Sequence, residues 1–203
     1  MNILAALKDG TMESHRALES GLPLMRDDLS FDEYMAMLKG FYGLYVPLER
    51  NLTAVNGFLE ALPDWQARMK APALAADLAD LGIEARSAVR LCEDVPAPTT
   101  TAEAFAVAYV MEGATLGGQI ISRHLRAVLG VHEDWGGRFF LSYKDGVGEM
   151  WQRFRIALQA AAPPGEWEAM VSASQRTFQV FREWLAEAGQ DEAAPPQSVS
   201  NCR

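Results

Sequence analysis

The stretch MEGATLGGQII, residues 111–121, places Gly113, Gly117 and Gly118 inside an apolar run that otherwise has the pattern of one long helix. Each glycine in a helix interior costs about 1 kcal/mol relative to alanine. Gly113 and Gly117 are four positions apart and therefore share one helix face. A chain that accepts this cost must bring something close to that backbone. The partner is either another helix, which leaves Gly118 as a further cost, or a bound group.

The rest of the sequence also has helical periodicity, and no segment shows the alternating pattern of a strand. Ser30 with Glu33, and Thr100 with Glu103, form capping boxes that start two of the helices. Pro47 is expected to kink or break the second helix. The predicted helices cover residues 2–20, 31–57, a short segment between Pro72 and Gly82, 101–129 ending at Gly130, 146–161 and 166–188. The predicted fold class is all-α, a single-domain helical bundle.

Length and composition limit the possible classes of protein. The chain has 203 residues with 49% hydrophobic content, which suits one domain with a sizeable core. We expect a helical domain over residues 1–188 and a disordered tail over 189–203, which is rich in Pro, Ser, Gln and Ala. The net charge of -9 argues against nucleic-acid binding. Cys92 and Cys202 lie far apart, so neither a disulfide framework nor structural zinc is indicated.

The sequence contains no pattern that directs it to a membrane. The N-terminal segment has no basic region followed by a small-residue cleavage site, so no signal peptide is predicted. No apolar run is expected to approach the roughly 20 residues that span a bilayer. We therefore expect a cytoplasmic protein without a membrane partner.

His15 is the candidate metal ligand, because Glu19 follows it by four residues on the same helix face. A carboxylate there can hold one imidazole nitrogen and leave the other directed outward as a ligand. The alternative is an exposed histidine with an ordinary hydrogen bond. A di-iron site is excluded, since none of the three histidines has a glutamate three residues before it. A dinucleotide site is excluded because no strand precedes the GATLGG run.

His15 and the glycines together suggest a flat, wide ligand between two helices. A planar macrocycle could take His15 as the axial ligand of its metal, while the glycines let the opposite backbone approach its other face. Helix packing at the glycine positions remains the alternative at this level. Residue spacing alone does not choose between them.

Two motifs resemble one protein family. The segments LKDGTMESHRALESGLPL and SFDEYMAMLKGFYGLYVPLE resemble the opening of heme oxygenases, and AYVMEGATLGGQIISRHL resembles their distal helix. The order of elements agrees from about Leu4 to about Leu185. The form of the second motif is similar to that of the soluble bacterial branch, which includes enzymes that supply biliverdin to bacterial phytochromes.

The resemblance assigns the two faces of a heme site. It implies that His15 is the proximal ligand of the heme iron and that Glu19 hydrogen-bonds the other imidazole nitrogen. It also implies that Gly113, Gly117 and Gly118 lie over the heme on the distal side, with Gly113 and Gly117 part of the catalytic environment.

The resemblance further assigns the wall and edge of this site. Tyr109 is implied to be a phenol of the pocket wall near the reacting oxygen. Arg155 matches a basic residue that pairs with a heme propionate, and Lys8 matches another near the heme edge. Phe178 matches an aromatic residue of the distal wall. The alternative for Arg155 is a solvated helix face, and for Phe178 a place in the core.

The sequence departs from the pattern of the mammalian branch at three positions. An aspartate that organises distal water in that branch is replaced here by Ala114. Met12 and Trp151 stand where lysines near the propionates occur. Proton delivery and the seating of the heme are therefore the features that the resemblance leaves open.

The activity implied is oxidative opening of heme to biliverdin, with release of carbon monoxide and ferrous iron. Heme b is then both cofactor and substrate, molecular oxygen is the co-substrate, and a ferredoxin- or flavoprotein-type reductant supplies electrons. The reaction would serve one of two purposes. It would supply biliverdin as the bilin chromophore of a bacterial phytochrome, or it would release iron from heme for iron acquisition. Two alternatives stay open: a non-catalytic heme-binding or heme-transfer protein of the same fold, and a helical interaction protein without heme.

Overall fold

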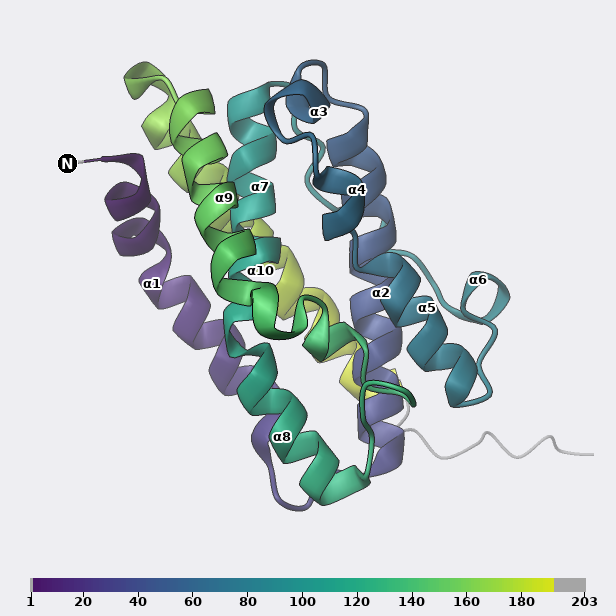
Figure 1. Ribbon diagram of the computed structural model, residues 1–203. Coiled ribbons are helices and arrows are strands. Elements are labelled where there is room, and N and C mark those ends of the chain that lie inside the picture. The colour runs from purple at the N-terminus through teal and green to yellow at the C-terminus, as the bar shows by residue number, and fades with distance from the viewer. Residues whose placement is uncertain (1, 192–203) are drawn as a thin grey trace, which may run out of the picture.

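Helix α10 (Trp167–Asp191) crosses the molecule and packs against α1 (Ile3–Gly21), α7 (Thr101–Gly113) and α2 (Phe31–Thr53) (Figure 1). The structure is a computed structural model that describes residues 2–191. Helix α9 (Val147–Ala161) packs against α7, and α5 (Ala71–Asp80) packs against α2. The prediction of a single-domain all-α fold is confirmed, and the described residues contain no β-strand.

The remaining helices complete the bundle. The remaining α-helices are α3 (Phe58–Ala61), α4 (Trp65–Arg68), α6 (Ala85–Ala88) and α8 (Gly118–Leu129). The 3-10 helices are η1 (Pro23–Met25), η2 (Ala114–Gly117), η3 (Phe139–Leu141), η4 (Lys144–Gly146) and η5 (Pro164–Glu166). The final helix continues to Asp191, three residues past its predicted end, and the rest of the predicted tail, 192–203, lies outside the described residues.

Consecutive side chains of α10 fasten two different helices. The Ser174 hydroxyl donates a hydrogen bond of 2.8 Å to the Ala106 carbonyl of α7. The Gln175 amide donates one of 2.7 Å to the Gly10 carbonyl of α1. A side chain at Gly10 would overlap Val171 of α10, so the glycine allows α1 to lie close to α10. Helix α10 therefore sets the separation of α1 and α7.

Local signals set most helix ends as predicted. Ser30 and Glu33 form the complete reciprocal capping box. Thr100 accepts from the Glu103 backbone N–H, but the Glu103 carboxylate accepts from the Thr99 backbone N–H rather than from that of Thr100. Gly130 ends α8 with φ of 75°, a left-handed conformation that glycine adopts without strain.

Pro47 does not break its helix, which was one of the two effects predicted for it. Helix α2 continues from Phe31 to Thr53 with Pro47 buried inside it. A proline cannot donate to the carbonyl four residues earlier, which here belongs to Gly43. The backbone N–H of Cys92 donates to that carbonyl over 2.9 Å instead. A long-range hydrogen bond thus satisfies the group that the proline leaves without an intrahelical donor.

The predicted helix over 101–129 is divided in the structure. The chain forms α7, changes to the 3-10 helix η2 over Ala114–Gly117, and resumes as α8. The glycines therefore stand at the junctions rather than inside one regular α-helix. The Thr115 hydroxyl donates to the Glu112 carbonyl over 2.7 Å and satisfies an acceptor at the junction.

The same stretch corrects the expectation about apolar runs. Thr101–Leu129 is long and apolar enough to span a bilayer by length and composition. Half of its most apolar window is buried inside the molecule, and α7 packs against α10 and α9. Its apolar character is therefore explained by its place in the core.

A buried carboxylate fastens the segment that follows α8. Asp77 of α5 accepts the backbone N–H groups of Arg138 and Phe139, at 2.9 and 2.8 Å, and pairs with the Arg138 guanidinium. Asp77 is fully buried. Removing it would leave these donors without an acceptor.

We expect Asp77→Ala to lower the free energy of unfolding by about 3 kcal/mol, because it breaks a buried charge pair and orphans two backbone donors. Urea unfolding measures the change. Asp134→Ala is the control, since this exposed aspartate lies in the same segment and should change stability by less than about 0.5 kcal/mol. Equal effects of the two substitutions would contradict the assignment.

Candidate active site

A cavity of about 630 Å³ lies between α1, the junction of α7 with η2 and α8, and α10. Its wall is mainly apolar, with a small number of polar side chains. The polar residues of the wall are Lys8, Thr11, His15, Glu19, Tyr45, Lys70, Tyr109 and Thr115. A largely apolar cavity with few polar groups is the usual form of a site for an organic ligand.

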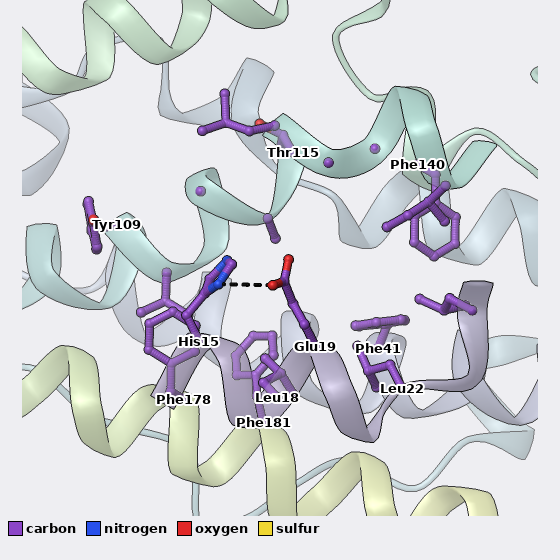
Figure 2. A pocket seen from close by; sticks show the side chains of 18 of the residues that line it. His15, Leu18, Glu19, Leu22, Phe41, Tyr109, Thr115, Phe140, Phe178 and Phe181 are labelled. Atoms are coloured by element: carbon purple, nitrogen blue, oxygen red, sulfur yellow. Dashed lines mark ion pairs between the residues drawn. The ribbon is translucent and has the colours of Figure 1, made fainter. Parts of the chain in front are cut away.

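His15 and Glu19 project from α1 into this cavity, toward the segment that carries Thr115 (Figure 2). The imidazole Nδ1 lies 3.2 Å from Glu19 Oε2. A carboxylate at this distance favours a proton on Nδ1, which leaves the lone pair on Nε2. Both side chains are at least half exposed, so Nε2 is accessible to a ligand. The predicted pairing is present in the structure.

Phe178 supports the imidazole from α10. The two rings meet edge to face with centroids 5.8 Å apart. Phe178 belongs to the cavity wall, but it packs against His15 rather than against the glycine segment. The resemblance implied a place on the distal wall, and the structure instead puts this ring beside the candidate ligand.

The three positions lack a side chain for two different structural reasons. A methyl group added at Gly113 would meet no atom within 4 Å, and one at Gly117 would meet only Ile121 at 3.9 Å. Both positions belong to the cavity wall, so their missing side chains leave room there. A methyl group at Gly118 would collide with the Phe140 backbone carbonyl. Gly118 is therefore required by packing of α8 against η3, although it also borders the cavity.

Tyr109 lies in the wall as predicted, four residues before Gly113. Its ring is tilted against Trp151 with centroids 5.8 Å apart. Burial raises the pKa of the phenol, and hydrogen bonding with Thr11 and the charge of Arg155 oppose that rise. Tyr109 therefore keeps its proton at neutral pH.

The two predicted basic residues occupy different places. Lys8 borders the cavity with an exposed side chain. Arg155 is exposed on α9 and does not border the main cavity; it borders a neighbouring groove that shares Trp151 with it. Arg155 is close enough to influence the Tyr109 phenol electrostatically. It therefore lies at the rim rather than in the wall.

The positions that depart from the resemblance all border the cavity. Ala114 and Met12 are exposed toward it, and Trp151 stacks on Phe154 with centroids 5.7 Å apart. The Ala114 side chain provides neither a proton nor a hydrogen bond.

An aromatic cluster that the sequence analysis missed closes one end of the cavity. Phe41 and Tyr45 of α2 contact Phe139, and Phe41 also contacts Phe140. Phe181 of α10 meets Tyr45 with centroids 5.9 Å apart. These rings come from three distant parts of the chain, so no local pattern could have grouped them.

A buried charged cluster was also missed. Its members are Glu49, Arg68, Lys70, Glu112 and Tyr143. The four residues other than the tyrosine are each at most 3% exposed as whole residues. Glu112, which directly follows the apolar run of residues 104–111, was the available signal, because a carboxylate buried next to such a run requires a partner.

The family model for heme oxygenases matches residues 1–187. The chain belongs to the heme oxygenase family. A heme oxygenase from Xanthomonas campestris pv. campestris (strain 8004) is 32% identical over 152 residues, which are 68% of this chain and 86% of that protein.

Solved structures of heme oxygenases share the fold. The NO- and CO-bound enzyme from Neisseria meningitidis has a TM-score of 0.79 at 21% identity, covering 98% of this chain and 96% of that one. Heme oxygenase-1 from the cyanobacterium Synechocystis sp. PCC6803, in complex with heme, has a TM-score of 0.76 at 20% identity, covering 94% of each chain. The chain is an oxidoreductase with heme oxygenase activity, and the general reaction of its family yields biliverdin and carbon monoxide.

The residues of the cavity fit a heme. One wall provides an imidazole with a free nitrogen, the opposite wall has glycines without side chains, and the remainder is apolar. A neutral nitrogen donor suits iron, and an apolar slot suits a porphyrin face. The donor set and the cavity therefore agree with the heme-binding family.

The glycines allow a sharp test. Gly118→Ala should lower the free energy of unfolding of the apoprotein by about 2 kcal/mol, because the methyl group overlaps a backbone carbonyl. Gly113→Ala should leave it unchanged or raise it by up to about 1 kcal/mol, since the site is open.

Hemin affinity should follow a different order. Gly113→Ala places a methyl group in the cavity and should weaken hemin binding about tenfold, equal to about 1.4 kcal/mol. Thermal unfolding and hemin titration of the two variants check both expectations. A destabilised Gly113→Ala apoprotein would show that Gly113 is a packing residue.

Proposed function

We propose that His15 is the axial ligand of the heme iron in a biliverdin-producing heme oxygenase. The observation that carries this proposal is the orientation of the imidazole: Nδ1 faces Glu19, so Nε2 is the nitrogen left for a metal. Among the described residues, His15 is the one histidine in the cavity wall. Glu19 holds the proton on Nδ1 and orients the ring.

The segment from Gly113 to Gly118 forms the opposite, oxygen-binding side in this proposal. Gly113 and Gly117 leave space beside the ligand plane, and Tyr109 and Ala114 border the same space. A wall without side chains excludes little volume and would leave room for oxygen beside a bound heme. The contribution of these glycines to catalysis is the space that they leave.

The propionates would lie toward the exposed rim, where Arg155 and Lys8 offer cations. Arg155 can form a bidentate pair with a carboxylate and thereby limit rotation of the porphyrin in its plane. Because Met12 and Trp151 replace two cations of the mammalian pattern, Arg155 carries more of this positioning.

Heme b supplies the iron that activates molecular oxygen and is itself the substrate. The electrons come from an external donor of ferredoxin or flavoprotein type, which we assign to the cytoplasm with the enzyme. The Glu112-Gly113-Ala114-Thr115 form of the glycine motif resembles the bacterial branch that supplies bilins to phytochromes. We therefore favour a bacterial phytochrome as bilin acceptor over iron acquisition.

Reconstitution with hemin, followed by ascorbate or a ferredoxin system in air, tests the proposal. The Soret band should appear at one hemin per chain and decay into biliverdin absorption. A Soret band that persists under reduction in air would identify a heme-binding or heme-transfer protein instead. Chromatography of the product identifies which isomer forms.

His15→Ala should abolish the normal axial ligation, because the cavity wall contains no second imidazole among the described residues. Absorption spectra of the hemin complex measure this change, and added imidazole should restore the spectrum. His124→Ala is the control, since that imidazole hydrogen-bonds the Arg26 carbonyl away from the cavity. An unchanged spectrum of His15→Ala would refute the ligand assignment.

Arg155→Gln should alter the ratio of biliverdin isomers, because it removes the proposed anchor of a propionate. It should also weaken hemin binding about tenfold, as expected for loss of one charged hydrogen-bonded pair. Arg153→Gln is the matched control on the same helix, where the native arginine pairs with Glu149 at the surface. Identical product ratios in both variants would remove Arg155 from the site.

A further inference from the structure

Lys70 combines two properties that no other cation of the described cavity wall shares. It borders the cavity, and its side chain is only 4% exposed. Lys8, the other lysine of the wall, is exposed. A buried ammonium at a cavity is costly unless hydrogen bonds and opposite charges surround it.

The hydrogen bonds of Lys70 leave part of its capacity unused. An ammonium group has three hydrogens. Nζ donates to the Arg68 carbonyl and, over 2.6 Å, to the Tyr143 hydroxyl. The Glu112 carboxylate lies 3.6 Å from Nζ, which is an ion-pair distance rather than a hydrogen bond. One N–H is therefore held only by this ion pair, and the residue that carries it borders the cavity.

The charged side chains around Lys70 come from α2, α4 and α7. Glu112 of α7 accepts from Arg68 over 2.5 Å and from the Tyr143 hydroxyl over 2.6 Å. Glu49 of α2 accepts the backbone N–H groups of Lys70 and Ala71. Arg68 of α4 is itself held by Asp64. Both carboxylates that face Lys70 are thus committed to other donors as well.

The position of the cluster matches the oxygen-binding side proposed above. Glu112 directly precedes Gly113, and Lys70 is held against Glu112, across the cavity from α1. Ala114 leaves this side without the carboxylic acid of the mammalian pattern. Lys70 therefore lies where a proton source is missing.

The other polar groups of the wall are poor proton donors. The Thr11 and Thr115 hydroxyls donate to backbone carbonyls. Burial raises the pKa values of the Tyr45 and Tyr109 phenols, so both hold their protons firmly. Burial instead lowers the pKa of Lys70 to about 8, against the opposing effect of Glu112 and Glu49. An acid with a pKa near the working pH transfers protons most efficiently.

We propose that Lys70 donates protons to the oxygen-binding side of the cavity. This inference rests on the proposed function of the cavity. One proton leaves Lys70 Nζ, which becomes a neutral amine. The amine then takes a proton from water in the cavity, while the Tyr143 hydroxyl, which accepts from Nζ and donates to Glu112, holds the side chain in place. The charge of the cluster is restored after each cycle.

Lys70→Met tests this assignment through the spectrum of the ferric hemin complex. Loss of a nearby positive charge should raise the pKa of iron-bound water by about one unit, since a cation stabilises the hydroxide form. A pH titration of the visible bands measures it. Lys144→Met is the control, because Lys144 is 70% exposed and pairs with Glu133 at the surface. An unchanged transition in Lys70→Met would make Lys70 a structural residue and overturn the proposal.

The apoprotein provides a second readout. The chain has four lysines, so their side-chain carbon resonances can be assigned by substitution. The resonance that Lys70→Met removes should titrate below the other three. Titration together with the surface lysines would overturn the proposal without any heme present.

Turnover provides a third readout of proton donation by Lys70. Lys70→Met should slow conversion of bound heme by about 100-fold, as for loss of a general acid. Tyr143→Phe keeps the ammonium and removes only one of its hydrogen-bond acceptors, so it should slow turnover less than Lys70→Met and move the water transition less. Absence of biliverdin in the wild type would instead refute the proposed function, because that result does not depend on Lys70.

Discussion

The attachment of α10 to two helices at once is the constraint on which the site depends. Ser174 binds the backbone of α7, and Gln175 binds the backbone of α1. Because consecutive residues of one helix point in different directions, these bonds hold α1 and α7 apart rather than together. The space between them is the cavity. A bundle in which α1 packed directly on the glycine segment would bury more apolar surface and would have no site.

Two properties of the wall determine what the cavity can bind: open space at the glycines and buried charge at Lys70 and Glu112. At Gly113 and Gly117 the chain omits side chains, and the open space has no packing role. At Lys70 and Glu112 it buries charges beside an apolar volume, at a desolvation cost that only a closed set of hydrogen bonds offsets. Space and charge therefore meet on one side, and the imidazole of His15 lies on the other.

Features with local causes were predictable from the sequence. The Ser30 capping box, the glycine stop at Gly130 and the pairing of His15 with Glu19 each involve residues at most four positions apart. The break allowed for at Pro47 does not occur, and the sequence could not show this because Cys92, a distant donor, satisfies the Gly43 carbonyl. The lysine and tyrosine of the charged cluster are separated by 73 residues, so no periodicity could connect them.

The sequence by itself determined the all-helical class, most helix ends and the candidate iron ligand, because these follow from hydrogen bonds and spacing within one or two turns. It also identified the glycines as a place of close approach. Only the tertiary structure decided what approaches each one. Gly118 lacks a side chain because the Phe140 carbonyl occupies that space, whereas Gly113 and Gly117 face the cavity. The difference depends on which distant segment lies opposite each residue, and that is set by packing.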